Sequence, residues 1–176
     1  PAIPCSLPRF VREQAEVVQL LEQYGIKASQ PFIAVHPWTS NPVKQWPADR
    51  FQSLIRQSIE RLAIPVVIIG GAEHAARAHE VIPAGAPVAD VSGQLSLRQL
   101  AALLQMAKLL VSNDSGPVHL AAAVNTKTLV LFGTDAPATG PVRWGPWGEG
   151  HAVITKPSME AISVDEVLDM LQRQLA

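Results

Sequence analysis

Three polar loops of this 176-residue chain each follow a short apolar run, and their side chains suit the binding of a phosphate-bearing ligand. The most informative is the loop SNDSGPVH, residues 112–119. Asp114 or Ser115 can cap the helix that this loop opens. Gly116 lets a ligand approach the backbone closely, and Pro117 suits the first helical turn. Because a helix N-terminus presents free N–H groups and a positive dipole end, we expect it to bind a phosphate.

Further groups suited to an anion come from the same helix and from a second loop. His119 lies about one turn into the helix and can add a hydrogen bond. Thr39 and Ser40 offer hydroxyls, and Lys44 offers a cation suited to phosphate oxygens. Simpler roles remain open for these residues. The first loop is also compatible with helix capping alone, and the second with a solvated loop that carries a surface lysine.

The third loop carries an acidic residue. Glu73 follows Gly70–Gly71, where its carboxylate can accept hydrogen bonds from ribose hydroxyls. A tight turn followed by a Glu that the helix dipole favours is an equally good interpretation. The chain contains no HExxH, CxxC, GxSxG or GxxxxGK[ST] pattern, and no GxGxxG follows an apolar run. We therefore expect no metal site, no cofactor and no nucleophile of these types.

Apolar runs alternate with helical patterns along the chain, and this alternation predicts the fold that positions the loops. The expected strands are residues 32–35, 65–69, 88–91, 109–111 and 128–132. The expected helices are residues 9–24, 47–62, 73–81, 96–107, 118–124 and 163–175. The stretch 133–150 is too rich in Gly and Pro for regular structure. The pattern predicts an α/β protein with a Rossmann-like, doubly wound parallel sheet, whose polar loops meet at the carboxyl edge.

Composition and charge exclude several classes of protein. The chain is 48% hydrophobic and 16% charged, which fits buried parallel strands covered by helices. A net charge of −1 with scattered Lys and Arg offers no basic stripe, so we expect no nucleic-acid partner. The single cysteine, Cys5, fits a reducing, cytoplasmic setting. No apolar run reaches the roughly 18–20 residues of a membrane span, and the start lacks a signal-peptide pattern.

The start of the chain is typical of a linker. The first residue is Pro1 rather than Met, and Pro4 and Pro8 follow within a few positions. We expect residues 1–30 to form a linker and a first helix, and residues 31–176 to form one ligand-binding domain. We also expect the chain to be cut from something longer.

Five motifs, in order along the chain, resemble the C-terminal half of the bacterial heptosyltransferases of glycosyltransferase family 9. They are residues 36–47 (HPWTSNPVKQWP), 70–73 (GGAE), 92–97 (SGQLSL), 112–123 (SNDSGPVHLAAA) and 131–133 (LFG). The resemblance runs from about Phe32 to about Gly148. It implies a GT-B architecture, in which two Rossmann-like domains face each other across a cleft and the C-terminal domain holds the nucleotide-sugar donor. The order of residues 132–137 departs from the family pattern.

The resemblance also implies an activity: inverting, metal-independent transfer of a sugar from an ADP-sugar, ADP-heptose, to a lipopolysaccharide-core-type glycolipid. The implied donor-binding residues are Thr39, Ser40, Lys44, Glu73, Leu95, Asp114, Ser115, Gly116 and His119. Glu73 would bind the ribose and Leu95 the adenine, while the others would hold the diphosphate and the sugar. The family's general base is an Asp of the N-terminal domain, so we expect no catalytic residue in this chain. Its implied partners are the donor, the missing N-terminal domain and, through that domain, the acceptor.

Two rival functions remain open at this point. A nucleotide-sugar epimerase of the same architecture would act on a UDP-sugar without a separate acceptor, and a stand-alone nucleotide-binding module would catalyse nothing. We expect a cytoplasmic location, with peripheral association at the inner face of the inner membrane left open. We also expect the substitution Lys44→Ala to weaken ADP binding while leaving the melting temperature of the unliganded protein nearly unchanged.

Overall fold

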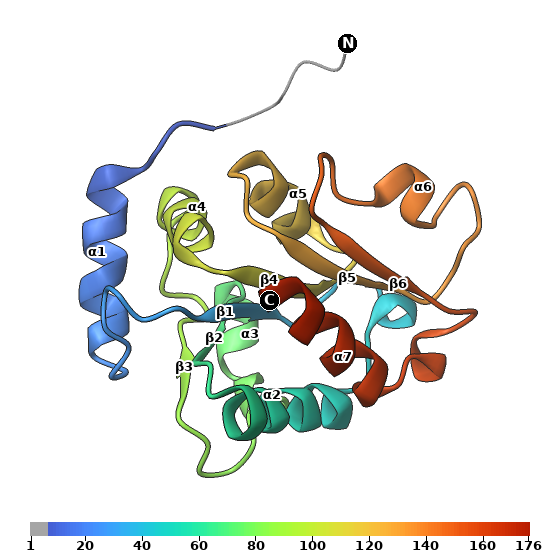
Figure 1. Cartoon of the computed structure of the whole chain (residues 1–176), viewed down its shortest axis with the longest axis horizontal. Coiled ribbons are helices and arrows are strands. Elements are labelled where there is room, and N and C mark those ends of the chain that lie inside the picture. Colours follow the sequence, from blue (N-terminus) through green and yellow to red (C-terminus); the bar gives the residue numbers. More distant parts are fainter. Residues whose placement is uncertain (1–6) are drawn as a thin grey trace.

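Six parallel strands form the centre of the computed structural model, which describes residues 7–176 (Figure 1). The strands are β1 (Ile33–His36), β2 (Val66–Ile68), β3 (Val88–Asp90), β4 (Leu109–Asn113), β5 (Thr128–Phe132) and β6 (Ala152–Thr155). They are ordered β3-β2-β1-β4-β5-β6, and every neighbouring pair runs parallel. This is the Rossmann order, in which the chain starts at the centre and winds outward in both directions. The predicted α/β, doubly wound fold is confirmed.

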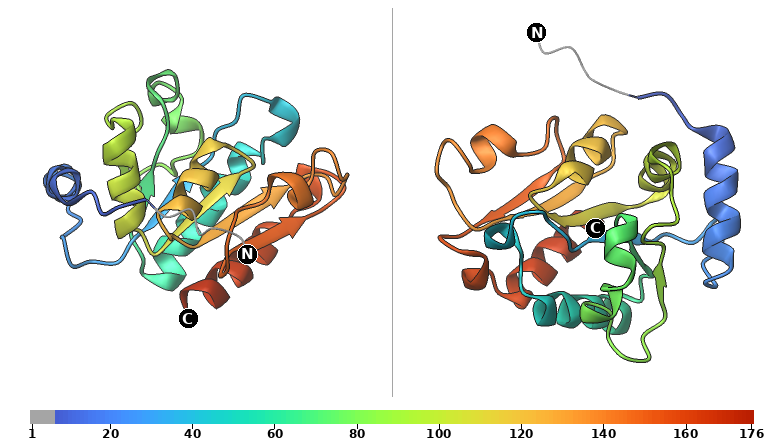
Figure 2. Two further views of the ribbon diagram at one scale, coloured as in Figure 1. Left: turned by 90° about the horizontal axis from the view of Figure 1, so that it is seen from above. Right: turned by 180° about the vertical axis from the view of Figure 1, so that it is seen from behind.

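Helices cover both faces of the sheet. The α-helices are α1 (Val11–Glu22), α2 (Ala48–Leu62), α3 (Ala72–Ala75), α4 (Leu97–Met106), α5 (Gly116–Ala123), α6 (Pro141–Trp144) and α7 (Val164–Leu175). Three 3₁₀ turns are η1 (Pro42–Lys44), η2 (Ala78–Glu80) and η3 (Met159–Ala161). Helices α2 and α7 pack on one face, while α4 and α5 pack on the other, with α1 on the outer side of α4 (Figure 2).

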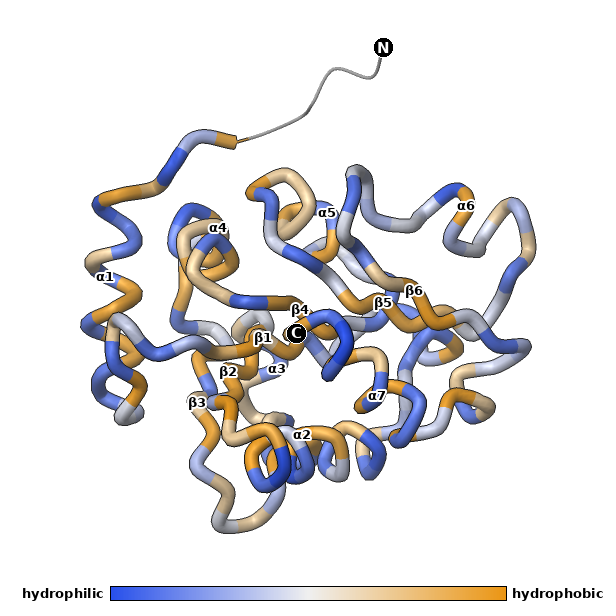
Figure 3. Tube along the Cα trace, in the orientation of Figure 1, coloured by the Kyte–Doolittle hydropathy of each residue, from blue (hydrophilic) through white to orange (hydrophobic). Residues whose placement is uncertain are grey.

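Successive residues of each strand point to opposite faces of the sheet and pack into separate hydrophobic clusters. In β1, Ile33 and Val35 point to the side of α2 and α7, where Phe51 and Leu168 are buried. Ala34, between them, points to the side of α1 and α4. Because both faces are covered, the strands are mostly apolar on both sides rather than alternating between apolar and polar residues, as the colours of the central strands in Figure 3 show.

Three details differ from the sequence-based expectation. Strand β6 was not expected; it is four residues long and half-buried at the sheet edge, which leaves only a weak pattern. The short helix α6 lies inside the stretch expected to be irregular. The expected helix over residues 73–81 is divided into α3 and η2. Arg77, the N-cap residue of η2, forms an ion pair with Glu80 three residues later, which suits the three-residue period of a 3₁₀ turn.

Helix α1 shares a hydrophobic core with the sheet. Val17 and Leu21 are buried against the side of α4, and Glu13 pairs with Arg98 of that helix region at 2.5 Å. The predicted division at residue 30 stays a prediction. The first part of the expected linker, with Cys5, lies outside the described residues. Among residues 7–176, no helix combines the length and apolarity needed to cross a bilayer.

Candidate functional site

A pocket of about 450 Å³ opens where β1 and β4 end at the carboxyl edge of the sheet. The two strands are neighbours, but β1 leads into α2 on one face and β4 leads into α5 on the other. Such a switch point leaves a crevice between the diverging loops, and ligands of doubly wound sheets bind there. The walls are His36, Trp38, Thr39, Ser40, Asn41, Lys44, Glu73, His74, Asp114, Ser115, Gly116 and Pro117.

The structure brings most of the sequence-predicted residues into this pocket. Those in its wall are Thr39, Ser40, Lys44, Glu73, Asp114, Ser115 and Gly116. Within the described part of the chain, Leu95 and His119 are not among the residues that line it. Leu95 is half-buried against the core on the α4 side, and His119 is exposed on α5. Donor contacts by these two residues stay predictions.

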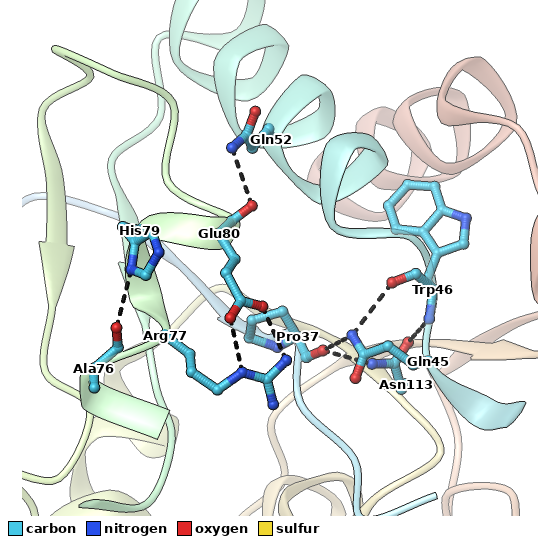
Figure 4. A network of polar contacts seen from close by, with 9 residues as sticks. All are labelled: Pro37, Gln45, Trp46, Gln52, Ala76, Arg77, His79, Glu80 and Asn113. Carbon is cyan, nitrogen blue, oxygen red and sulfur yellow. Dashed lines mark hydrogen bonds and ion pairs between the residues drawn. The ribbon is translucent and has the colours of Figure 1, made fainter. Parts of the chain in front are cut away.

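A buried amide holds the loop that carries Lys44. Asn113, the last residue of β4, donates from Nδ2 to the Pro37 carbonyl at 2.9 Å and accepts the Trp46 N–H at Oδ1 at 3.1 Å (Figure 4). Gln45 Nε2 also donates to the Pro37 carbonyl. No role was expected for Asn113. An amide that ends an apolar strand at the ligand-binding edge is the signal that points to it, because a buried amide needs partners.

Lys44 and Asp114 join the two loops across the pocket. Lys44 Nζ lies 2.5 Å from Asp114 Oδ2; about a third of the lysine side chain is exposed, but only 9% of the aspartate. Removing Lys44 would therefore leave a largely buried carboxylate without its partner, which destabilises a protein. From this geometry we instead expect Lys44→Ala to lower the melting temperature of the unliganded protein.

The pocket carries no excess of positive charge. Among the described residues of its wall, Lys44 is the only Lys or Arg, while Asp114 and Glu73 are acidic. Glu73 is largely exposed, so water screens it, whereas Asp114 is paired with the lysine. A bound phosphate must therefore rely on backbone N–H groups and hydroxyls in addition to Lys44.

The N-terminus of α5 supplies such groups. Ser115 is the N-cap residue, but among residues 7–176 its hydroxyl makes no capping hydrogen bond, and the Asp114 carboxylate is paired with Lys44. The interpretation of either side chain as a helix cap is therefore wrong. Pro117 lies in the first turn, as expected. A Cβ added at Gly116 would meet open space in the described structure, so the backbone there is accessible to a ligand.

Two histidines that the sequence analysis left without a role also line the pocket. His36 Nδ1 lies 3.0 Å from Ser115 Oγ. Burial removes water from this ring and, with a smaller contribution from His74, lowers the pKa of His36 from 6.5 to about 4. His74 stacks on the buried Trp38 at 5.1 Å between ring centroids and accepts the Gly71 N–H at Nδ1. The position of each residue in the sequence is the signal that points to it: His36 ends a strand, and His74 lies in the short helix that follows the next strand, both at the ligand-binding edge.

A second, smaller pocket of about 260 Å³ adjoins the first. The two share Lys44 and Asp114 in their walls, and the second extends along the segment after β5, past Thr134 and Thr139. Gly133 permits the close approach of η3 there, because an added Cβ would lie 2.7 Å from the Met159 nitrogen. The described residues hold no group of three or more His, Cys, Asp or Glu placed to bind a metal ion.

Comparison with known proteins relates this geometry to one family. The chain is 28% identical over 140 residues to lipopolysaccharide heptosyltransferase 2 of Escherichia coli K12, an alignment covering 76% of this chain and 40% of that protein. It superposes on the E. coli ADP-heptose LPS heptosyltransferase II structure with a TM-score of 0.82 and 24% identity, over 99% of this chain and 54% of that one. For the structure of E. coli heptosyltransferase WaaC with ADP, the TM-score is 0.70 at 24% identity, over 84% and 45%.

The chain thus spans about half the length, or less, of these proteins. Its sheet corresponds to one Rossmann-like half of a GT-B heptosyltransferase. The family model described as glycosyltransferase family 9 (heptosyltransferase) matches residues 6–170, which is most of the sequence. The chain therefore belongs to glycosyltransferase family 9, the heptosyltransferase family.

Proposed function

We propose that this chain is the donor-binding half of a glycosyltransferase and that the pocket between the β1 and β4 loops holds the diphosphate of an ADP-sugar, ADP-heptose. One observation carries the proposal: in a member of family 9, the accessible N-terminus of α5 and Lys44 meet at the switch point of the sheet. The relative whose structure contains ADP supports the choice of nucleotide.

The charge of each pocket residue determines which part of the donor it binds. The diphosphate lies against the backbone at Ser115 and Gly116 and is reached by Lys44 and by the hydroxyls of Thr39 and Ser40. Carboxylates repel phosphate but accept hydrogen bonds from sugar hydroxyls. Glu73, at the far wall, therefore binds the ribose, and Asp114 binds the transferred sugar in the adjoining smaller pocket.

The same groups assist bond cleavage. When the bond between the sugar and the diphosphate breaks, negative charge grows on the leaving oxygen. Lys44 and the dipole of α5 stabilise that charge without reorganising, which lowers the barrier in the manner of an oxyanion hole. The transfer is metal-independent and inverts the anomeric centre, because a hydroxyl of the acceptor attacks from the face opposite the leaving diphosphate.

The remaining parts of the reaction come from a second domain. An N-terminal domain, facing this one across a cleft, supplies the general base and binds a lipopolysaccharide-core-type glycolipid acceptor. No residue of this chain acts as the base. Location in the cytoplasm, at the membrane or away from it, stays a prediction that cell fractionation would test.

Calorimetric titration tests the donor site. ADP and ADP-heptose should bind, UDP should bind more weakly, and EDTA should leave the affinity unchanged. Failure to bind ADP would overturn the donor site, and a requirement for Mg²⁺ or Mn²⁺ would overturn metal independence. Product analysis of the two-domain protein separates the enzymatic alternatives, because an epimerase would convert a UDP-sugar without an acceptor. A protein that binds ADP but transfers no sugar with both domains present would be a binding module.

A further inference from the structure

A chain of hydrogen bonds crosses the floor of the pocket and ends in a backbone carbonyl. His36 Nδ1 lies 3.0 Å from Ser115 Oγ and 3.4 Å from Ser112 Oγ. The two serine hydroxyls lie 2.9 Å apart, and Ser112 Oγ lies 2.7 Å from the carbonyl oxygen of Asn113. His36 and Ser112 are buried, so water is not at hand to replace these partners.

The number of hydrogen atoms shared among these groups fixes which group donates in each hydrogen bond. The Asn113 carbonyl only accepts, so the Ser112 hydroxyl donates to it. With its one hydrogen committed, Ser112 must accept from Ser115. Ser115 has then used its own hydrogen, so the contact with His36 requires the ring to donate from Nδ1. One assignment satisfies all the contacts, and it places the histidine proton on Nδ1.

The other histidine tautomer leaves one contact in this series of hydrogen bonds without a hydrogen. If His36 carried its proton on Nε2, Nδ1 would accept the Ser115 hydrogen. The single Ser112 hydrogen could then serve either the Ser115 oxygen at 2.9 Å or the Asn113 carbonyl at 2.7 Å, and the other of these two contacts would join two acceptors. A contact between two acceptors in a buried site is unfavourable, because no water molecule can donate a hydrogen bond to either oxygen.

We propose that His36 is a positioning residue for ligand binding: its Nδ1–H holds the Ser115 oxygen at the start of α5 and leaves the Ser115 hydrogen free to turn toward an anionic ligand oxygen. This inference rests on the proposed function, since the ligand is the diphosphate. On binding, the Ser115 hydrogen leaves Ser112 Oγ, and the single Nδ1–H of His36 is shared between the Ser115 oxygen at 3.0 Å and Ser112 Oγ at 3.4 Å. No heavy atom has to move.

His36 does this without adding charge. Its ring is buried, and His74 lies edge-on to it at 6.3 Å between centroids, so a proton on both nitrogens is disfavoured near neutral pH. The other ionisable groups of the pocket wall are Lys44, Asp114 and Glu73. Both the neutral and the doubly protonated imidazole can donate a hydrogen bond from Nδ1. Only the neutral ring does so without adding a positive charge to the pocket.

The first test uses two side chains of matched shape. In His36→Asn the amide Nδ2 can replace the Nδ1 donor, because both nitrogens are bonded to Cγ, whereas His36→Leu has the same branching and no donor. Titration of the protein with ADP should give a dissociation constant for Asn within about threefold of wild type and for Leu roughly three- to tenfold weaker. Adding Ser115→Ala to the Leu variant should cost little more, since the histidine acts through that hydroxyl.

Equal ADP binding by the Asn and Leu variants would overturn the inference, as would additive losses from the Leu and Ser115→Ala substitutions. Should the Leu variant fail to fold, the ¹⁵N NMR spectrum of the wild-type ring decides without any variant or ligand. A proton on Nδ1 supports the inference, and a proton on Nε2 in a protein that binds ADP overturns it alone. A wild-type protein that does not bind ADP overturns the proposed function and the role of Ser115 with it.

Discussion

Replacing Lys44 by methionine tests the pairing across the pocket, because the substitution keeps the alkyl stem and removes the ammonium group. The structure predicts two separate losses. Without its partner 2.5 Å away, the Asp114 carboxylate keeps a largely buried charge, so the unliganded protein becomes less stable. The diphosphate also loses the one Lys or Arg that lines the described pocket, so binding weakens.

The stability loss can be bounded from the exposure of the two partners. Exposed pairs contribute about 0.2–1 kcal/mol, and breaking a fully buried pair costs about 3–5 kcal/mol. This pair lies between these limits, with a third of Lys44 and 9% of Asp114 exposed. We therefore expect a loss of about 1–2 kcal/mol, which for a chain of 176 residues lowers the melting temperature by about 2–8 °C.

Scanning calorimetry and ADP titration measure both effects, with Lys27→Met as the matched control, since Lys27 is exposed and outside the pocket. The control should change stability by less than about 0.5 kcal/mol. Adding Asp114→Asn to Lys44→Met should restore part of the stability by removing the unpaired charge. ADP binding should fall roughly ten- to a hundredfold in Lys44→Met. Equal melting temperatures for the two lysine variants would refute the pairing argument, and equal ADP affinities would refute the donor-site assignment.

Three further predictions follow from the same geometry. The pKa of His36 is lowered to about 4 in the folded state, so the unfolded state takes up a proton first as the pH falls. The free energy of unfolding therefore keeps its full value above pH 6.5 and falls by roughly 3 kcal/mol between pH 6.5 and about pH 4. Urea unfolding across this range should show that slope in the wild type and a flatter one in His36→Asn. Asp114→Asn should bind pyrophosphate more tightly, because the substitution removes a charge of the same sign as the phosphate. It should bind ADP-heptose relatively less tightly, because the amide is a weaker acceptor for sugar hydroxyls. Calorimetry that shows the same change for both ligands would exclude a sugar-binding role for Asp114. Gly116→Ala should keep the wild-type melting temperature but bind ADP less well, because the added methyl group enters open pocket space. Gly133→Ala should lower the melting temperature, because its Cβ would lie 2.7 Å from the Met159 nitrogen. The reverse pattern in melting and ADP-titration data would contradict the close approach seen at η3.

Part of the site was predictable from local pattern. The loops that carry Lys44, Glu73 and Asp114 each follow an apolar run, and in a parallel sheet the carboxyl ends of the strands share one edge. Seven of the nine expected donor-binding residues lie in the wall of the described pocket, whereas Leu95 and His119, which were also expected, do not. Local pattern could not assign partners, because a side chain in a polar loop has the same sequence signature whether it is solvated or paired.

Sequence alone determined the class of fold, since apolar runs of strand length alternate with helical periods and both signals are local. It missed β6, a four-residue strand in which two residues are buried and two are partly exposed, because so short a segment carries little of that signal. Only the tertiary structure decided that β1 and β4 lie side by side, because strand order depends on contacts between distant segments. The pairing of Lys44 with Asp114 and the contact of His36 with Ser115 follow from that neighbourhood. Both interactions act over about 3 Å, a distance that only the packed backbone sets.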